Sequence, residues 1–338
     1  MERQVSAIVS SIDVAKYAGV SQTTVSRVLN TPHLVKQPTF NKVMRAIEEL
    51  NYIPNANARS LVKKKTGTIA LISGPLSNHF FVDTTTSIVN YVTNLGYKIN
   101  VHFSDIGNLE ETYSAVFENR VDGIILSSIL IEDPIYEKIL KSGIPFILFN
   151  RKHESNQNFV EMDNDQAGFL ATSYLLDSGH RNIAWVGGPS TMSTFKGRYN
   201  GFINALTRNS IKISKESIFF ENNTPDELRH TFSKLTKTPN QPSAICAATD
   251  ALAISLMDYY IGLGYKIPEN ISIIGIDNVK ISKHASINLT TVGINSSLDL
   301  GQIAIENLIR KIEENEELNV QITEPVRLFK RKTVKKKE

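Results

Sequence analysis

Cysteine is nearly absent from this chain of 338 residues: Cys246, in the apolar run SAICAATD, is the only one. A single cysteine excludes an internal disulfide, and a thiol inside an apolar run is far more often a core residue than a nucleophile. No apolar run approaches the ~20 residues that a membrane-spanning helix needs, and the first residues lack the apolar stretch of a signal peptide. We therefore expect a cytoplasmic protein, in a reducing compartment, that makes no membrane contact.

The sequence also lacks the motifs of cofactor and metal chemistry. No G-x-G-x-x-G follows an expected strand, and neither the phosphate-binding G-x-x-x-x-G-K-[ST] nor the nucleophile elbow G-x-S-x-G occurs. The histidines show no H-E-x-x-H or other metal-ligand spacing. We therefore expect no catalytic residue, no cofactor and no metal ion. An enzyme built on a doubly wound sheet is the alternative that these absences count against.

Net charge is small, +3, but it is unevenly distributed. Between Ser11 and Lys65, nine Lys and Arg stand against three Asp and Glu, and the tail from Lys330 has six basic residues and one acid. The interval 66–329 therefore carries −8. A basic head on an acidic body suggests a polyanion as partner of the head, because cationic groups near phosphates release condensed counterions. The basic tail is more simply interpreted as solvated surface.

The basic head contains the pattern of two short helices joined by a tight turn, in DVAKYAGVSQTTVSRVLN. Ser10 and Asp13 match a capping box, so a helix should begin there, and Gly19 is a natural end because glycine adopts the left-handed conformation. Ser21 should cap a second helix from Gln22 to about Leu29. Such a pair forms a helix-turn-helix, whose second helix enters the DNA major groove. The apolar positions expected to face the core are Ile12, Val14, Ala15 and Ala18 on the first helix and Val25, Val28 and Leu29 on the second.

The polar face of the second helix has side chains that suit duplex DNA. Arg27 can donate two hydrogen bonds to guanine, Gln22 can pair with adenine, and threonine methyl groups can contact thymine. The hydroxyls of Ser21, Thr24 and Ser26 suit phosphate oxygens, which set the register without reading sequence. A surface pair of helices is the plainer interpretation, but the spacing, the capping and the basic surroundings favour DNA binding.

A third helix is expected after Pro38, with an apolar face that closes a small three-helix core. The following stretch NYIPNANARSLVKKKTG is interrupted by Pro54, and NANARSL is too short and polar to form a stable helix alone. We expect a linker here that ends in the basic run 63–65.

The segments IDVAKYAGVSQTTVSRVLN and AIEELNYIPNANARSL resemble the headpiece and hinge of the LacI/GalR family of bacterial transcriptional repressors, almost without a gap over residues 10–61. The resemblance implies that Gln22, Thr23 and Arg27 read bases. The full set of residues expected to face DNA is Ser10, Ser21, Gln22, Thr23, Thr24, Ser26, Arg27, Asn30, Tyr52, Asn55, Ala58 and Leu61.

The resemblance also implies that NANARSL becomes helical only on operator DNA. Ala58 would then pack against Ala58 of a second subunit. Leu61 would insert between two base pairs from the minor groove, and the additional contacts made by the bent DNA would offset the free energy cost of unstacking. Two positions depart from the family pattern and affect the third helix. Phe40 stands where an arginine is usual, and Lys36 stands where a serine cap is frequent.

From Thr68 onward, short β-rich runs alternate with longer amphipathic segments, which is typical of a parallel sheet with helices on both faces. One series of expected strands is TIALIS, KINVHF, VDGIIL, PFILFN and NFVEMD; a second is RNIAWVGG, SIFFE, SAICAATD, ISIIGID and LTTVGI. Two series imply two similar lobes, each a doubly wound parallel sheet. The resemblance continues in GRYNGF and GYKIPENISIIGIDN, and implies a fold like that of periplasmic sugar-binding proteins.

Ligands of open α/β sheets bind beyond the carboxyl ends of the strands, so the residues at those ends form the expected effector site. Carboxylate, amide and guanidinium side chains there can hydrogen-bond to a small polyhydroxylated ligand, and flat aromatic rings can pack against it. The resemblance implies that Arg198 and Asp277 bind hydroxyl or acid groups of the effector, and it places Thr194, Asn150 and Asp250 nearby. The full set of expected effector-binding residues is Asn78, Phe80, Phe81, Asn150, Arg151, Asp163, Thr194, Arg198, Asp250 and Asp277.

We expect three parts in the chain: a helix-turn-helix headpiece at 1–54, a hinge at 55–66, and an effector-binding and dimerisation domain at 67–338. In that domain, lobe 1 would be about 67–164 and 295–322, and lobe 2 about 165–294 and 323–332. The chain would then cross between the lobes three times, which makes a hinge that can close on a ligand.

The sequence thus predicts a repressor that binds a palindromic double-stranded operator as a homodimer. A small metabolite between the lobes, a sugar, a sugar acid or a sugar phosphate, would switch it by favouring one state of closure. Whether the effector releases or promotes DNA binding, and whether a protein corepressor takes part, stays open at this stage. No heptad segment follows the basic tail, which favours a dimer over a tetramer. A sugar transport receptor is a further alternative, and the helix-turn-helix counts against it.

Overall fold

The structure is a computed structural model. It describes residues 9–53, 65–103, 109–220, 225–237, 240–314 and 319–337. The expected hinge residues Asn55, Ala58 and Leu61 lie outside these ranges. The chain divides into two compact units, Met1–Thr66 and Gly67–Glu338, which are described separately. Within the described ranges, no helix combines the length and the apolar character needed to cross a bilayer.

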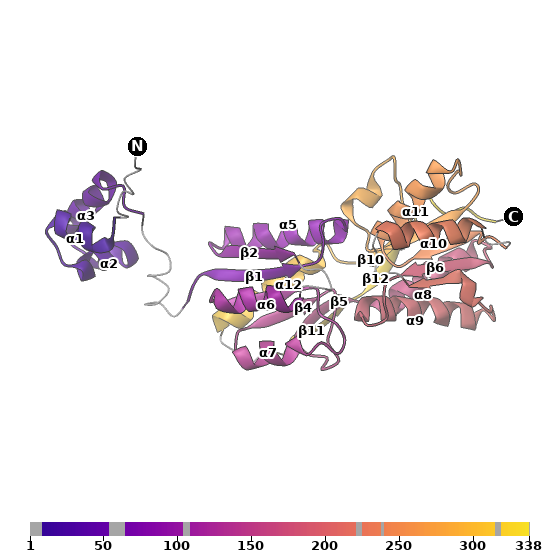
Figure 1. Cartoon of the computed structure of the whole chain (residues 1–338), viewed down its shortest axis with the longest axis horizontal. Helices are drawn as coiled ribbons and strands as arrows, with labels where there is room; N and C mark the ends of the chain where they lie inside the picture. The colour runs from indigo at the N-terminus through magenta and orange to yellow at the C-terminus, as the bar shows by residue number, and fades with distance from the viewer. Residues whose placement is uncertain are drawn as a thin grey trace. The chain divides into compact units, whose positions relative to one another are not determined.

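The first unit is a small helical bundle (Figure 1). Its elements are α1 (Ser11–Ala18), α2 (Gln22–Asn30), a 3-10 turn (Pro32–Leu34) and α3 (Gln37–Glu49). The capping box of α1 is present, because the Asp13 carboxylate accepts from the Ser10 backbone N–H at 2.9 Å while the Ser10 hydroxyl accepts from Asp13 N–H. Gly19 ends the helix in the left-handed conformation, with φ of 65°. Lys36 precedes α3 without a side-chain cap.

The core of this bundle contains most of the expected apolar residues. Ile12 is the exception, because half of its surface is exposed (50%). It lies two positions before Val14, and two residues turn a helix by about 200°, which puts Ile12 on the opposite side. The buried apolar residues are Val14, Ala15, Val25, Val28, Val43 and Ala46.

The second unit contains two six-stranded sheets, one in each lobe (Figure 1). The first has the order β11-β5-β4-β3-β1-β2 and all its pairs are parallel. Its strands are β1 (Thr68–Ser73), β2 (Lys98–Phe103), β3 (Gly123–Leu126), β4 (Phe146–Phe149), β5 (Phe159–Met162) and β11 (Gln321–Glu324). Its helices are α5 (His79–Asn94), α6 (Leu109–Glu118), α7 (Ile135–Ser142) and α12 (Leu300–Glu314).

The second sheet has the order β12-β10-β9-β8-β6-β7. It departs from the expected all-parallel sheet at one edge, where β12 runs antiparallel to β10. Its strands are β6 (Ile183–Gly187), β7 (Ile218–Phe220), β8 (Ala244–Ala247), β9 (Ser272–Ile276), β10 (Thr291–Ile294) and β12 (Val326–Phe329). Its helices are α8 (Asn164–Asp177), α9 (Ser193–Arg208), α10 (Pro225–Lys237) and α11 (Asp250–Gly262). Figure 1 shows α8 and α9 on one side of this sheet and α10 and α11 on the other.

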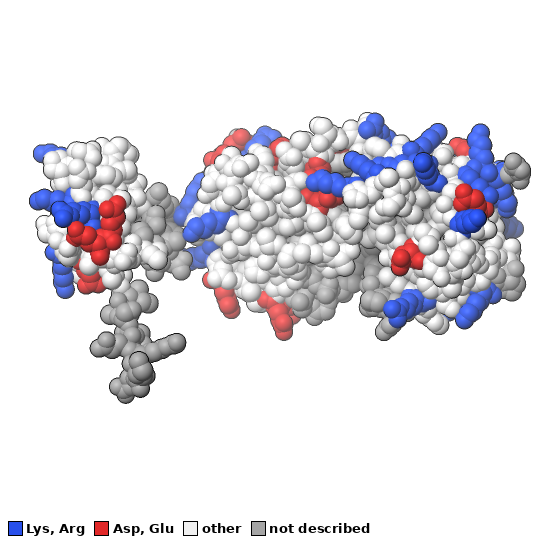
Figure 2. Space-filling view, turned by 90° about the horizontal axis from the view of Figure 1, so that it is seen from above, with Lys and Arg blue, Asp and Glu red and all other residues white. Residues whose placement is uncertain are grey.

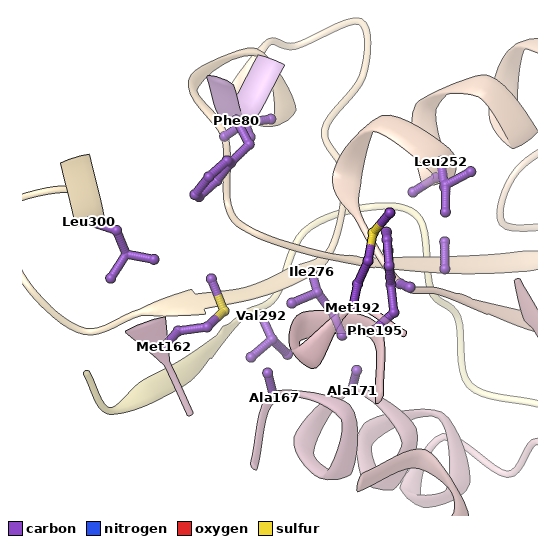
Figure 3. Close-up of a cluster of buried hydrophobic side chains, with 14 of the residues drawn as sticks. Phe80, Met162, Ala167, Ala171, Met192, Phe195, Leu252, Ile276, Val292 and Leu300 are labelled. Carbon is purple, nitrogen blue, oxygen red and sulfur yellow. The ribbon is translucent and has the colours of Figure 1, made fainter. Parts of the chain in front are cut away.

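The chain passes to the other lobe after β5, after β10 and after β11. One cluster of buried apolar side chains continues through these crossings (Figure 3). Phe80, Met162 and Leu300 belong to elements of the first lobe, and Ile276 and Val292 belong to strands of the second. Because this cluster is shared, the lobes are packed on each other at the crossings.

Candidate functional site

The exposed side of α2 is the first candidate surface. Its recognition face, as we call it, consists of the four exposed side chains Gln22, Thr23, Ser26 and Arg27. Gln22 Nε2 donates to Ser11 Oγ at 3.0 Å, which ties this amide to α1. Within the described residues, the Arg27 guanidinium forms no ion pair, so all its donors face solvent.

Other expected DNA contacts have local roles around α2. Ser21 caps the helix by accepting from Thr24 N–H at 3.2 Å, and the two hydroxyls are 2.9 Å apart. Asn30 Nδ2 donates to the Ser26 carbonyl at 2.9 Å. Tyr52 is half-buried against the headpiece core. Among the described residues of the set, Thr23 and Arg27 are the exposed side chains with no such local hydrogen bond.

Arg198, in α9, lies at the centre of a second site, where the two lobes meet. Its side chain is fully buried and donates to four partners from different elements. These are Asn164 Oδ1 at 3.0 Å, the Ala248 carbonyl at 2.5 Å, Asp277 Oδ1 at 2.7 Å and Met162 Sδ at 3.4 Å. We call this arrangement the lobe junction, because Met162 ends β5 of the first lobe while Asp277 follows β9 of the second.

Three glycines let α8 and α9 approach closely enough to bury Arg198. A Cβ on Gly168 would lie 1.9 Å from the Arg198 carbonyl oxygen, and one on Gly201 would lie 1.9 Å from the Asp165 carbonyl oxygen. A Cβ on Gly197 would lie 2.8 Å from the Cβ atom of Asn164. The motif GRYNGF, with its glycines four residues apart, therefore sets the position of the arginine.

Two buried carboxyl groups lie beside the arginine. Asp250, the first residue of α11, accepts from Val279 N–H at 3.0 Å and from the Thr291 hydroxyl. Burial, and to a smaller extent the nearby Asp277, raise the pKa of Asp250 to about 7. Burial also raises the pKa of Asp277, while Arg198 acts in the opposite direction. The junction thus holds one buried cation and two carboxyl groups.

Asn150 follows β4 and is held in the left-handed conformation, with φ of 64°. The Thr194 hydroxyl donates to its backbone carbonyl. Its side-chain Oδ1 is buried and has no hydrogen-bond partner among the described residues. Asp277, with φ of 134°, is a second residue in this unfavourable region. Strained backbone of this kind clusters at binding sites, and a buried unpaired acceptor costs about 1–3 kcal/mol.

A small cavity of about 150 Å³ adjoins the junction. Within its lining, Lys152 Nζ lies 2.6 Å from Glu161 Oε1, and Asn164 Nδ2 donates to Glu161 Oε2 at 3.1 Å. Burial raises the pKa of Glu161, against the effect of Lys152. The lining residues are Lys152, Glu161, Asp163, Asn164, Asp165, Ser193, Gly197 and Thr323.

The remaining expected effector residues have other places. Phe80 and Phe81 are buried, with ring centroids 5.4 Å apart, and pack in the apolar cluster. Asn78 caps α5 and Asp163 caps α8. Arg151 donates to the Ser128 carbonyl at 3.1 Å, and desolvation lowers its pKa to about 10. No contact in the described structure links Arg151 to Arg198.

The expected effector set leaves out several residues of the junction, although Asn164 was recognised beside Asp163 as a strand-end residue. Asn164 stands at a strand end beside the expected Asp163, yet it is Asn164 that binds the guanidinium. Met162 and the Ala248 carbonyl carry no chemical signal in the sequence. Lys152 and Glu161 lie within two residues of expected strand ends, so a wider search there would have found them.

Comparison with known proteins identifies the families to which two parts of the chain are similar. Residues 12–55 match the model of bacterial regulatory proteins of the lacI family, and residues 172–334 match a periplasmic binding protein-like domain. The chain is 33% identical to the transcriptional repressor PurR of Vibrio vulnificus over 308 residues, which are 90% of this chain and 92% of that protein. It is also 33% identical to catabolite control protein A of Priestia megaterium over 306 residues, 89% of this chain and 92% of that one.

Solved structures give the same result. The lac repressor dimer bound to operator and the anti-inducer ONPF matches with a TM-score of 0.82 and 27% identity, over 97% of this chain and 99% of that one. A complex of the regulator CelR with cellobiose matches with a TM-score of 0.70 and 25% identity, over 96% and 99%. PurR is named as a transcriptional repressor and CelR as a transcriptional regulator. With its helix-turn-helix headpiece and its effector-binding domain of two α/β lobes, the chain belongs to the LacI family of DNA-binding transcriptional repressors.

Proposed function

We propose that this repressor binds a palindromic operator as a homodimer and that a small metabolite at the lobe junction changes its affinity for DNA. The recognition face carries the first half of the proposal. A short helix presents an amide, hydroxyls and an unpaired guanidinium to solvent, and those groups match base edges of the major groove. One headpiece makes few contacts, so two related by a two-fold axis suit a palindrome.

Asn150 supports the second half of the proposal, the binding of a small metabolite at the lobe junction. Its unpaired buried oxygen lies beside Thr194, at the strand end where the family would bind its ligand. A ligand hydroxyl or amine would satisfy this acceptor, while Arg198 and Asp277 could exchange their mutual ion pair for contacts with a polar ligand. Among the similar structures, CelR was solved with cellobiose and the lac repressor with ONPG. These features support a sugar, a sugar acid or a sugar phosphate as the effector.

The volume of the adjoining cavity adds a mechanical argument. Small-molecule sites typically enclose about 300–1,000 Å³, whereas this cavity has about 150 Å³. This cavity is therefore too small for a sugar. The lobes would have to move apart to admit the sugar and then close around it in a different arrangement. Such a change at the junction is the means by which the ligand would alter the geometry of the paired headpieces.

A selection from random duplexes tests the DNA half. The full chain should enrich a two-fold symmetric sequence, bind it with two chains per duplex, and lose affinity steeply as salt is raised. Equal retention of selected and random duplexes would contradict the proposal.

A thermal-shift screen of sugars, sugar acids and sugar phosphates tests the effector half, because a ligand raises apparent stability by mass action. Asn150→Ala should abolish the shift. Asn156→Ala is the matched control, since Asn156 is also left-handed, with φ of 55°, but exposed. If both variants respond to the ligand like the parent, the ligand does not bind at Asn150.

A further inference from the structure

A hollow on the second lobe has no part in the proposed function. Its volume is about 650 Å³, and it is formed by β7, the 3-10 turn that precedes it (Lys215–Ser217) and α10. It shares no residue with the lobe junction. We call it the lysine pocket; its lining residues are Lys215, Glu216, Ile218, Phe219, His230, Ser233, Lys234 and Lys237.

The pocket wall on α10 follows from the helix repeat. Residues 230, 233, 234 and 237 have the spacing i, i+3, i+4 and i+7, so they form one stripe. The neighbouring face of α10 buries Phe232 and Leu235 in the core, which fixes the direction of this stripe. On the opposite wall, Ile218 and Phe219 of the edge strand β7 are half-buried and add apolar surface.

The lining has a net positive charge. It has three lysines against one glutamate. Lys215 and Lys237 are exposed and form no ion pair within the described part of the chain. The lobe around the pocket has the same sign: residues 164–294 and 325–338 include 19 Lys and Arg against 11 Asp and Glu.

The other lobe has the opposite sign. Residues 67–163 and 295–324 include 8 Lys and Arg against 19 Asp and Glu. Figure 2 shows Lys and Arg side chains spread over the second lobe. An anion approaching the body is therefore drawn toward the second lobe and repelled by the first.

We propose that the lysine pocket binds a small organic phosphate, as a second ligand site separate from the junction. Lysine ammonium groups bind phosphate as point charges, and the wall of Ile218 and Phe219 would contact the organic part. The volume suits a metabolite of nucleotide size. A single hollow bounded by one helix and one strand end fits a compact ligand better than a duplex or a long acidic peptide, which need an extended groove.

Calorimetric titration of the full chain with AMP, adenosine and inorganic phosphate tests the proposal. AMP should bind most tightly, and its affinity should fall as salt is raised. Lys215→Ala/Lys237→Ala should weaken AMP binding about tenfold or more, since each lost charge removes a favourable contact. The matched control is Lys266→Ala/Lys283→Ala, which removes two exposed lysines from the same lobe outside the pocket.

Two further measurements locate the ligand. Trp185 is the only tryptophan and pairs in register with Ile218, so AMP should change its fluorescence in the parent and the control but not in the pocket variant. Asn150→Ala should leave AMP binding unchanged, which separates this site from the effector site. The proposal is overturned if pocket and control variants lose affinity equally, if AMP binds no better than adenosine, or if only duplex DNA or a long polyanion binds.

Discussion

A buried arginine is stable only when its donors are paired, and Arg198 shows how four elements supply the partners. The amide of Asn164, a carbonyl, a thioether and the Asp277 carboxylate surround one guanidinium. Removing one partner of a buried ion pair typically costs about 3–5 kcal/mol, because the other charge stays buried. Three of these partners belong to the second lobe, and Met162 alone joins the arginine to the first. The polar partners are positioned to be exchanged for a polar ligand.

The pKa of Asp250 gives the first prediction at the residue scale. It is raised in the folded protein to about 7 from an ordinary value of 3.8, mainly by burial. The folded state therefore binds this proton more tightly than the unfolded state. The resulting stabilisation is complete below about pH 4 and is lost as pH rises through about 7.

Asp250→Asn should remove this pH dependence. Between pH 4 and 7, the free energy of unfolding of the parent should fall relative to the variant, by at most roughly 1.4 kcal/mol per pH unit. Urea unfolding at several pH values measures the difference. Asp258→Asn, an exposed control on the same helix, should stay parallel to the parent. A constant separation between the parent and Asp250→Asn would show that Asp250 does not titrate in this range.

Arg27 gives the second prediction at this scale. Arg27→Ala should weaken operator binding by about 1–3 kcal/mol and relax the preference at one base pair, because a forked contact to guanine is lost. Fluorescence anisotropy on operator variants measures both effects. Arg45→Ala removes the same charge from α3 of the headpiece, where Arg45 pairs with Glu49 at 2.9 Å, and should keep the sequence preference. An Arg27→Ala protein that retains full discrimination would disprove the assignment of the recognition face.

At the scale of elements, the crossing of α8 and α9 depends on glycines. Gly201→Ala would place a methyl group 1.9 Å from the Asp165 carbonyl oxygen, so the helices must move apart. We expect a loss of about 1–3 kcal/mol, the usual cost of overpacking, and a weaker response to effector because Arg198 moves with α9. Thermal unfolding and the thermal-shift screen measure the two effects.

Gly262→Ala is the matched control for this change. Gly262 ends α11, and a methyl group there would meet nothing within 4 Å. Because alanine favours helix by up to about 1 kcal/mol over glycine, this variant should be as stable as the parent or slightly more stable. Equal stability of Gly201→Ala and Gly262→Ala would mean that the helices have room to adjust.

The same scale shows what sequence patterns reveal. All ten expected strands are present. Eight of them are apolar runs that the sheets bury on both faces, while the edge strands β2 and β7 are only half-buried or exposed. The strands β11 and β12 were not predicted. Each is at a sheet edge with a single partner strand, and the stretches QITE and VRLF alternate between half-buried and exposed positions. Without a buried apolar run, they resemble loops in the sequence.

The candidate site was predictable only in part, for a related reason. Strand ends identify which polar residues gather at a sheet edge, and Asn150, Thr194, Arg198 and Asp277 were found in this way. The pairing of Arg198 with Asp277 joins residues 79 apart in the sequence. It depends on how α9 packs against the end of β9 within the second lobe, which no local pattern gives. Local pattern also cannot separate Phe80 and Phe81, which are core residues here, from aromatic side chains that line a cleft.

At the scale of the whole molecule, contacts between the lobes decide how far the structure is closed. The Ile131 N–H donates to the Thr191 carbonyl at 3.0 Å, and Lys152 N–H donates to Ser193 Oγ at 2.9 Å. Farther along the interface, Asp83 of α5 accepts from the Lys280 N–H at 2.8 Å, and its carboxylate lies 3.8 Å from Lys280 Nζ. Each of these contacts joins a different pair of segments from the two lobes. A substitution can therefore remove one contact and leave the others in place.

Asp83→Ala should shift the protein toward open lobes. The lost hydrogen bond and exposed ion pair together contribute about 1 kcal/mol, which is about a fivefold change in the ratio of closed to open forms. Small-angle scattering should show a larger radius of gyration, and an effector that favours closure should bind correspondingly more weakly. Asp83→Asn keeps an oxygen that can accept from the Lys280 N–H, so it should lie between the parent and Asp83→Ala. If Asp83→Ala leaves both the radius and effector affinity unchanged, this contact does not contribute to closure, and the other contacts between the lobes suffice.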